Sequence, residues 1–326
     1  MSSISLSSPS KVWFKSGRVP LADLKNGGLL LVHGGAGPQD PKGESFLLGQ
    51  KFLSEMLDSI YCQSALVNTA GILPDLCREW PQIHLASRLI LEATRKMESE
   101  PMLNSGYGAS LQSDGVARVS ASFMESQHRK FSAVMNTTDL EHPSELAWWL
   151  QRERFSVLDS MGAKNLKEQL GCSKKNLITS ERLERWIQYK KQKVSGRTST
   201  VGAIAIDAQN NLAVLTSTGG VGNETPGRVG DSPTIAGNYC TRRVAVSCTG
   251  FGEQIISHAV SPRLAIAFEQ GKTLFQAAEE VFTSAAAQNF SFAAIAVASH
   301  FETDEIEWVA ISSQCQLLWD LRVISS

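Results

Sequence analysis

The segment SGRTSTVGAIAID, residues 195–207, joins a polar, basic stretch directly to an apolar run. Thr198, Ser199 and Thr200 stand at the border, and the run from Thr200 to Asp207 predicts a buried β-strand. A hydroxyl is a weak nucleophile unless a base lies beside it. If the bond between Ser199 and Thr200 were cut, Thr200 would carry its own base, a free α-amine with a pKa of about 7.7 to 8.0. The segment therefore suggests a threonine nucleophile held at the edge of a rigid strand, although TVG alone is more typical of a residue that merely caps a strand.

The composition is that of a globular chain with a large core. Of the 326 residues, 42% are hydrophobic and 19% are charged. The 31 lysines and arginines nearly balance the 32 aspartates and glutamates. Because no strong net field attracts nucleic acid or a membrane surface, we expect neither as a partner and favour a small neutral or zwitterionic molecule.

Neither the cysteines nor the apolar segments indicate export or a membrane span. There is no CxxC pair and no histidine spacing typical of a metal site, so we expect reduced thiols in the cytoplasm. No apolar run reaches the roughly 20 residues of a membrane helix, and residues 1–20 lack the apolar centre of a signal peptide. Residues 1–28 are predicted to form an N-terminal tail. The cysteines are Cys62, Cys77, Cys172, Cys240, Cys248 and Cys315.

The first part of the chain alternates helical and strand patterns. A buried strand with a glycine loop is predicted at 28–37, and Asp114-Gly115 is typical of a hairpin turn within 103–124. The basic stretch 173–199 is predicted to be a solvated helix face followed by a connector. Helices are predicted at 47–69, 84–99 and 144–170.

The second part is richer in strands. Apolar runs predict strands at 200–207, 211–218 and 243–250, then two helices within 253–288, then two strands at 292–299 and 306–313. Strands followed by helices and again by strands indicate an α+β sandwich.

The common catalytic motifs are missing. The sequence has no GxSxG, HExxH or P-loop, the glycines at 34, 35 and 37 do not fit GxGxxG, and His33 is more typical of a structural histidine. Threonine does recur beside glycine-rich turns, at Thr200, Thr218 and Thr249. The loop TSTGGVGNETPGRVGDSP (216–233) also carries Arg228 and Asp231, whose spacing alone is more typical of a surface ion pair.

Five segments together resemble one family. VHGGAG (32–37), LNSGYGASLQSDG (103–115), STVGAIAID (199–207), TSTGGVGNETPGRVGDSP (216–233) and VAVSCTGFGE (244–253) are similar, in this order, to the landmarks of the plant-type L-asparaginase and isoaspartyl peptidase family. Its members are N-terminal-nucleophile hydrolases that cut themselves before a threonine. The resemblance covers roughly residues 29–300 and is strongest to the cyanobacterial members.

The resemblance implies a role for each matching residue. Thr200 would be the nucleophile, oriented by the hydroxyl of Thr218, and Thr249 with the Gly250 N–H would form the oxyanion hole. A guanidinium binds a carboxylate through two parallel hydrogen bonds, which suits Arg228 to the substrate's α-carboxylate. The resemblance also implies that Asp231 binds the substrate's α-ammonium and that Gly250 and Gly252 contact the substrate. Gly34 and Gly35 would support the strand before the cleavage site, and Asn104 would pack beneath the nucleophile.

Three positions depart from the family's pattern. Ser199 stands where Gly or Asp is common, Ser105 makes NSG where NAG is usual, and Ser120 replaces a common acidic residue. Because glycine adopts a strained backbone more readily than serine, we expect Ser199 to slow self-cleavage. Relatives bind sodium in a loop through backbone carbonyls, so the resemblance allows a structural sodium ion in the 103–126 region without requiring it. We predict no other metal and no cofactor.

The resemblance implies one αββα sandwich domain that is split into two chains. The α chain would comprise the tail and residues 29–199, of which 173–199 form the linker before the cleavage site, and the β chain would comprise residues 200–326. It also implies a dimer of αβ units. The expected reaction is hydrolysis of β-aspartyl amides, in isoaspartyl dipeptides or L-asparagine. The alternatives are a taspase-like threonine endopeptidase, a glycosylasparaginase, and an uncleaved, inactive binding or scaffold homologue.

Overall fold

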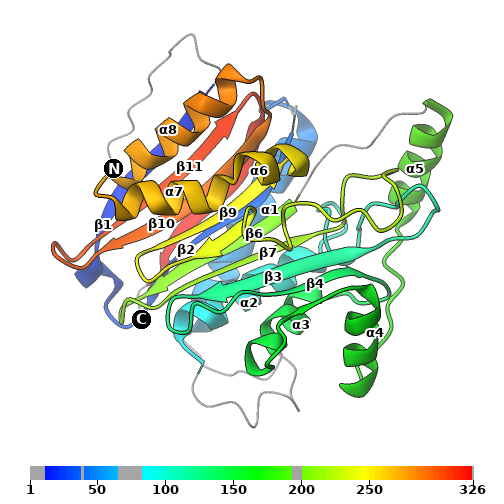
Figure 1. The fold of residues 1–326 in the computed structure, drawn as a ribbon, viewed down its shortest axis with the longest axis horizontal. Coiled ribbons are helices and arrows are strands. Elements are labelled where there is room, and N and C mark those ends of the chain that lie inside the picture. Colours follow the sequence, from blue (N-terminus) through cyan, green and yellow to red (C-terminus); the bar gives the residue numbers. More distant parts are fainter. Residues whose placement is uncertain (1–11, 38–39, 65–82, 193–199, 325–326) are drawn as a thin grey trace.

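The computed structural model describes residues 12–37, 40–64, 83–192 and 200–324. These residues form two β-sheets that lie face to face (Figure 1). One sheet has the order β1 (Val12–Pro20), β11 (Glu305–Ser313), β10 (Phe292–His300), β9 (Val244–Gly250) and β8 (Asn238–Cys240). The other has the order β12 (Gln316–Ile324), β2 (Gly28–Gly37), β6 (Thr200–Asp207), β7 (Leu212–Thr218), β3 (Val119–Glu125), β4 (Ser132–Thr137) and β5 (Val157–Leu158).

Helices cover the outer face of each sheet. The seven-stranded sheet is covered by α1 (Glu44–Ser64), α2 (Leu85–Glu98), α3 (Pro143–Trp149) and α4 (Ser160–Gln169). The five-stranded sheet is covered by α7 (Val260–Glu269) and α8 (Leu274–Ala287), and the short α6 (Gly252–His258) follows β9 (Figure 1). The four layers are helices, sheet, sheet and helices, as the αββα expectation has it.

Strand β2 explains why several strands read as unbroken apolar runs. Leu29 and Leu31 belong to the core between the two sheets, whereas Leu30 and Val32 belong to the core under the helices. Alternate residues of a strand point to opposite faces, so a strand covered on both sides is apolar throughout. The same reasoning applies to β6, which is buried along its whole length.

The prediction of an N-terminal tail over residues 1–28 is partly wrong. Residues 12–20 form β1, which pairs antiparallel with β11, and Leu21–Leu24 form a 3-10 turn. Val12 and Phe14 pack on the core of the five-stranded sheet, whereas Trp13 between them is more exposed and its ring lies 6.5 Å from that of Trp319 in β12. An edge strand with one solvent-facing side has the mixed composition of a tail, and only its partner strand distinguishes the two.

Two helix predictions also need correction. The helix expected over 144–170 is two helices, because β5 lies between them and pairs in parallel with β4, and the Asp159 carboxylate then caps α4. The segment 253–288 holds three helices, because Ala259 adopts a left-handed conformation (φ 47°) between α6 and α7. The strands β4, β8 and β12 were not predicted.

Other predictions are confirmed. Asp114-Gly115 forms a turn, Gly115 has a φ of 81°, and Leu111 bridges Ala117 across it. Within the basic stretch, α5 (Ser180–Gln192) is a helix with no buried residue. Among the described residues, no helix is both long and apolar enough to cross a membrane.

Candidate active site

Thr200 and Thr218 face each other across neighbouring strands. They are register partners at the ends of β6 and β7, and the Thr200 Oγ1 donates a hydrogen bond to Thr218 Oγ1 over 3.2 Å. The Gly220 N–H donates to the same Thr218 oxygen over 3.1 Å. Thr218 is therefore placed to orient the Thr200 hydroxyl, and both side chains are less than one-tenth exposed.

Thr249 lies in the space between the sheets, at the same end as Thr200. Ser247, two residues earlier in β9, hydrogen-bonds to Thr216 of β7 over 2.8 Å, so this face of β9 is turned toward β7. Thr249 is fully buried, and its Oγ1 has no hydrogen-bond partner among the described residues. Gly250 follows with a φ of 137°, and a Cβ there would lie 2.5 Å from the Phe292 Cα. Since a buried polar group without a partner is costly, the Thr249 hydroxyl is a donor available to a bound molecule.

Arg228, Asp231 and Gly252 form one cluster. A Cβ at Gly252 would lie 2.8 Å from Asp231 Oδ1 and 2.9 Å from Arg228 Nη2, so a side chain at this position would displace both groups. Arg228 forms a two-pronged ion pair with Glu253, with both N–O distances 2.8 Å. The expectation of a surface ion pair between Arg228 and Asp231 is thus replaced by one between Arg228 and Glu253.

The Asp231 carboxyl group is buried, which disfavours its charged form. It is 4% exposed, and its Oδ2 has no hydrogen-bond partner among the described residues. Burial raises the pKa of Asp231 to about 7. A buried carboxylate of this kind would be stabilised by a cation such as a ligand's ammonium group.

Asn104 ties a loop to the turn after Thr218. Its backbone carbonyl accepts from the Gly219 N–H over 2.8 Å, and its Nδ2 donates to the Gly220 carbonyl over 2.6 Å. Its Oδ1 accepts from the Ser110 N–H over 2.8 Å. Asn104 is therefore placed to fix the backbone of the turn that begins at Thr218.

Comparison with known proteins identifies the family. A family model described as asparaginase matches residues 84–304, more than half of the chain. The chain is 32% identical to the isoaspartyl peptidase/L-asparaginase of Synechocystis sp. over 283 residues. These aligned residues cover 82% of this chain and 81% of that protein. The corresponding protein of Nostoc sp. is 34% identical over 286 residues, which cover 82% and 85%. The chain belongs to the asparaginase family.

The family assignment confirms the resemblance drawn from the five motifs, including its cyanobacterial character. An Escherichia coli protein named isoaspartyl peptidase is also similar, at 32% identity over 272 residues, which cover 78% of this chain and 81% of that protein. All five motifs of this asparaginase-family chain lie at least partly within described residues.

Two expectations of the family pattern lie partly outside the described residues. Ser199 is one of residues 193–199, so the bond before Thr200 is not described. Gly34 and Gly35 lie in β2, beyond its last pair with β6 (His33 with Gly202), and a Cβ at Gly34 would lie 2.7 Å from Leu318 Cδ2. Their support of the strand before the cleavage site stays a prediction.

Sequence reasoning missed Ser232. Its Oγ lies 3.4 Å from Thr200 Oγ1, and its carbonyl accepts from Ser122 Oγ of β3 over 2.5 Å. Ser232 directly follows Asp231, and that adjacency was the one available signal. It is a second hydroxyl within reach of Thr200 Oγ1.

A buried polar network beneath Thr200 was also missed. His33 Nε2 lies 2.9 Å from Ser247 Oγ, and Thr216 Oγ1 donates to Asn238 Oδ1 over 2.9 Å. Burial lowers the pKa of His33 to about 3, so the imidazole is neutral at physiological pH. This agrees with the structural role expected for His33.

Several carbonyls at the start of the region expected to bind sodium already accept hydrogen bonds. The carbonyls of Met102 and Leu103 accept hydrogen bonds from Arg182 Nη2, and the Glu98 carbonyl accepts from the Tyr107 N–H. The described residues contain no group of three or more His, Cys, Asp or Glu side chains suited to a metal. A carbonyl oxygen that accepts one hydrogen bond still has a second lone pair for a cation. The sodium site in this region therefore stays a prediction.

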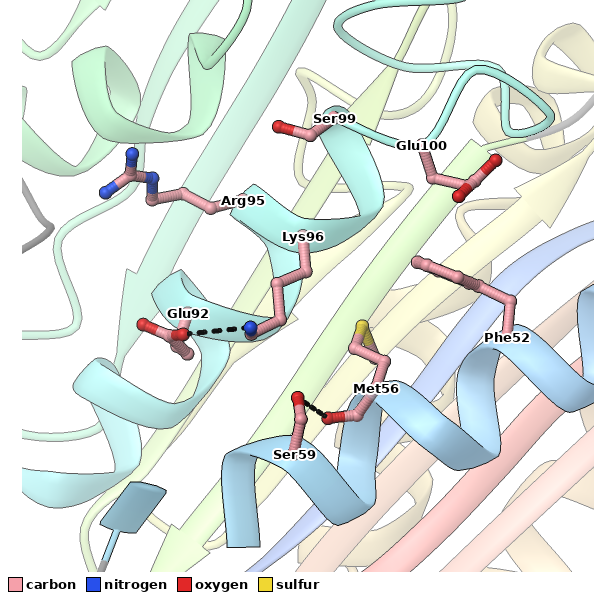
Figure 2. Close-up of a pocket in the computed structure, with 8 residues that line it drawn as sticks. All are labelled: Phe52, Met56, Ser59, Glu92, Arg95, Lys96, Ser99 and Glu100. Carbon is pink, nitrogen blue, oxygen red and sulfur yellow. Dashed lines mark hydrogen bonds and ion pairs between the residues drawn. The ribbon is translucent and has the colours of Figure 1, made fainter. Parts of the chain in front are cut away.

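A surface pocket of about 520 Å³ lies between α1 and α2 and shares no residue with the threonine site (Figure 2). Both of its basic side chains are paired, Lys96 with Glu92 at 3.6 Å and Arg95 with Glu145 at 3.0 Å. The pocket is lined by Phe52, Met56, Ser59, Glu92, Arg95, Lys96, Ser99 and Glu100.

Proposed function

We propose that this protein hydrolyses β-aspartyl amide bonds, in isoaspartyl dipeptides or L-asparagine, and releases L-aspartate. The names of its relatives support this substrate class. The observation that carries it is the cluster of Arg228, Asp231 and Gly252 at the loop that follows Thr218. Arg228 supplies a cation for the α-carboxylate and Asp231 an anion for the α-ammonium of the aspartyl group.

We propose Thr200 as the nucleophile. Its Oγ attacks the side-chain carbonyl carbon of the substrate, while the free α-amine of Thr200 takes the hydroxyl proton. Thr249 and the Gly250 N–H stabilise the resulting oxyanion, an effect of about 3 to 4 kcal/mol for a key donor. The C–N bond breaks, and the departing amine takes the proton from the α-ammonium. Water then hydrolyses the ester to give L-aspartate and restore Thr200.

The α-amine becomes available through cleavage of the precursor. The Thr200 Oγ attacks the Ser199 carbonyl carbon, the peptide bond becomes an ester, and water opens that ester. The products are a new carboxylate at Ser199 and a free amine at Thr200. We propose that the two chains stay together within one sandwich, because β6 at the start of the second chain pairs with β2 of the first. Dimerisation of these αβ units, with no nucleic acid or membrane partner, belongs to the same proposal.

Two measurements test the function. Mass spectrometry of the purified protein should show two chains produced by cleavage between Ser199 and Thr200. The matured protein should release L-aspartate from a β-aspartyl dipeptide. Matured protein that cuts an internal peptide bond of a longer polypeptide, or a glycosylated asparagine, in preference to both substrates would favour the other enzymes of this fold. A chain that never splits and never hydrolyses either substrate would be an inactive homologue.

A further inference from the structure

Helix α5 stands apart from the helices that cover the sheets. It lies at one end of the molecule, beside the loops at the ends of β3 and β7 (Figure 1). Arg182, Trp186 and Tyr189 are its half-buried residues at helical spacing, whereas its other side chains are mostly exposed. The helix therefore touches the rest of the protein through one narrow face.

Arg182 fastens this face to the loop that carries Asn104. Its Nη2 donates to the Leu103 carbonyl over 2.9 Å and to the Met102 carbonyl over 3.2 Å. Burial lowers the pKa of Arg182 to about 10, so the guanidinium is still charged at neutral pH. Hydrogen bonds from a charged donor are stronger than neutral ones, so this contact restrains the backbone next to Asn104.

Trp186 and Lys190 fasten the same face to the far end of that loop. Trp186 Nε1 donates to the Gln112 carbonyl over 2.9 Å, and Lys190 Nζ donates to the Ser113 carbonyl over 3.1 Å. The Trp186 ring also covers Gly115, where a Cβ would lie 3.3 Å from the ring. One helix thus holds both ends of the segment 102–113.

Each end of the segment leads directly to the candidate active site. At the first end, Asn104 hydrogen-bonds to Gly219 and Gly220, which follow Thr218. At the second end, the Gln112 Oε1 accepts from the Gly227 N–H over 3.0 Å, and Gly227 precedes Arg228. The first contact lies beside the nucleophile and the second beside the proposed carboxylate-binding residue.

We propose that α5 is a positioning element of the active site, in which Arg182 maintains the Thr218 turn through Asn104 and Trp186 maintains Arg228 through Gln112. This inference rests on the proposed function for its kinetic readout. It predicts that the contacts at the two ends of segment 102–113 affect different kinetic constants. Loss of the Arg182 contact lowers kcat, and loss of the Trp186 contact raises KM.

The first variant removes the guanidinium. Arg182→Gln is expected to lower kcat on a β-aspartyl dipeptide by about three- to tenfold, with KM changed less than twofold. Arg182→Lys keeps a charged donor and is expected to recover part of the loss. The matched control is Arg185→Gln, because Arg185 pairs with Glu181 on the outer side of the same helix. This control is expected to match the wild type.

The second variant removes one N–H and keeps an aromatic ring. Trp186→Phe is expected to raise KM by about three- to tenfold while kcat stays within about twofold. A merely structural role for α5 would lower kcat and stability together in both variants and would give no split. Equal kinetics of both variants and the Arg185→Gln control would overturn the proposal.

Hydrogen exchange reads the same coupling without a substrate. In the folded, purified chains, Arg182→Gln should speed exchange of the Gly219 and Gly220 amides by about three- to tenfold, and Trp186→Phe should do so at Gly227. Wild-type protein that does not hydrolyse β-aspartyl substrates would count against the proposed function alone. Unchanged exchange at all three glycines would count against the positioning role of α5, whatever the activity.

Discussion

The Thr200 and Thr218 hydroxyls lie 3.2 Å apart, at the first residue of β6 and the last residue of β7. The Thr200 hydroxyl donates to Thr218, whose oxygen also accepts from the Gly220 N–H. Two antiparallel strands thus hold the proposed nucleophile and the hydroxyl proposed to orient it as register partners on one face of the sheet.

Thr218→Val removes the oxygen that accepts the Thr200 proton and keeps the side-chain volume. We expect kcat for β-aspartyl hydrolysis to fall by about ten- to a hundredfold, with a smaller change in KM, because orientation matters most in the transition state. Steady-state kinetics of the matured protein checks this. The control Thr225→Val lies on an exposed part of the same loop and should leave kcat unchanged. A Thr218→Val protein with normal kcat would remove Thr218 from the mechanism.

Thr200→Ala removes the attacking oxygen of both proposed steps. We expect no self-cleavage and no hydrolysis, whereas Thr200→Ser should retain some of each because it keeps a primary hydroxyl. Intact mass before and after incubation measures the cleavage, and release of L-aspartate measures the hydrolysis. A Thr200→Ala chain that still splits before residue 200 would exclude Thr200 as the nucleophile.

Arg228→Lys retains the charge but loses the planar pair of donors. We expect KM for a β-aspartyl dipeptide to rise by about tenfold, equivalent to ~1.4 kcal/mol of binding, since the proposed pair of parallel hydrogen bonds to the α-carboxylate would be lost. Arg242→Lys, at an exposed position, is the control. If both variants have the same KM, Arg228 serves only its ion pair with Glu253.

Asp231 predicts a pH dependence of substrate binding. Its pKa of about 7 means that the carboxylate loses its charge as the pH falls below 7, and the substrate's α-ammonium would then lack its proposed partner. We expect KM to be about tenfold higher at pH 6 than at pH 8. Asp231→Asn should bind substrate weakly at both pH values. A KM that is flat across this range in the wild type would contradict the role of Asp231.

The same residue predicts a stability difference. A buried carboxyl whose pKa is raised on folding contributes most below its ordinary pKa, and that stability is lost as the pH rises through the folded value of about 7. We therefore expect Asp231→Asn to have a Tm about 2–5 °C above the wild type at pH 8, with a smaller gap at pH 5. Thermal unfolding followed by circular dichroism measures both values. A variant less stable than the wild type at pH 8 would show that the ionised carboxylate is satisfied in the free protein.

Ser199→Gly tests the barrier to maturation. Strained backbone stores about 1 to 3 kcal/mol, and each 1.36 kcal/mol of barrier is a tenfold change in rate. If Ser199 resists the strained conformer, the glycine variant should convert to its two chains about ten to a hundred times faster than the wild type. A gel time course of freshly purified protein follows the conversion. Equal rates in the two proteins would mean that Ser199 imposes no barrier.

Strands covered on both faces could be read directly from the sequence. The strand predicted at 200–207 is β6 with the same bounds, because residues 201–206 are all apolar or small and the strand is buried throughout. The edges of the sheets could not be read in this way. Strand β1 alternates half-buried and exposed residues and resembles a tail, and β12 acquires its identity only by pairing with β2.

The sequence by itself determined the family, the threonine at the start of β6, and the residue types that suit a free aspartyl head group. It did so because each depends on a short local pattern: a glycine turn, a strand edge, a cation and an anion three residues apart. The tertiary structure decided which groups meet. Ser232 approaches Thr200, Glu253 pairs with Arg228, and Arg182 reaches Leu103, and these partners are 25 to 79 residues apart in the sequence. Such contacts depend on the packing of whole strands and helices against one another, and no spacing along the chain encodes it.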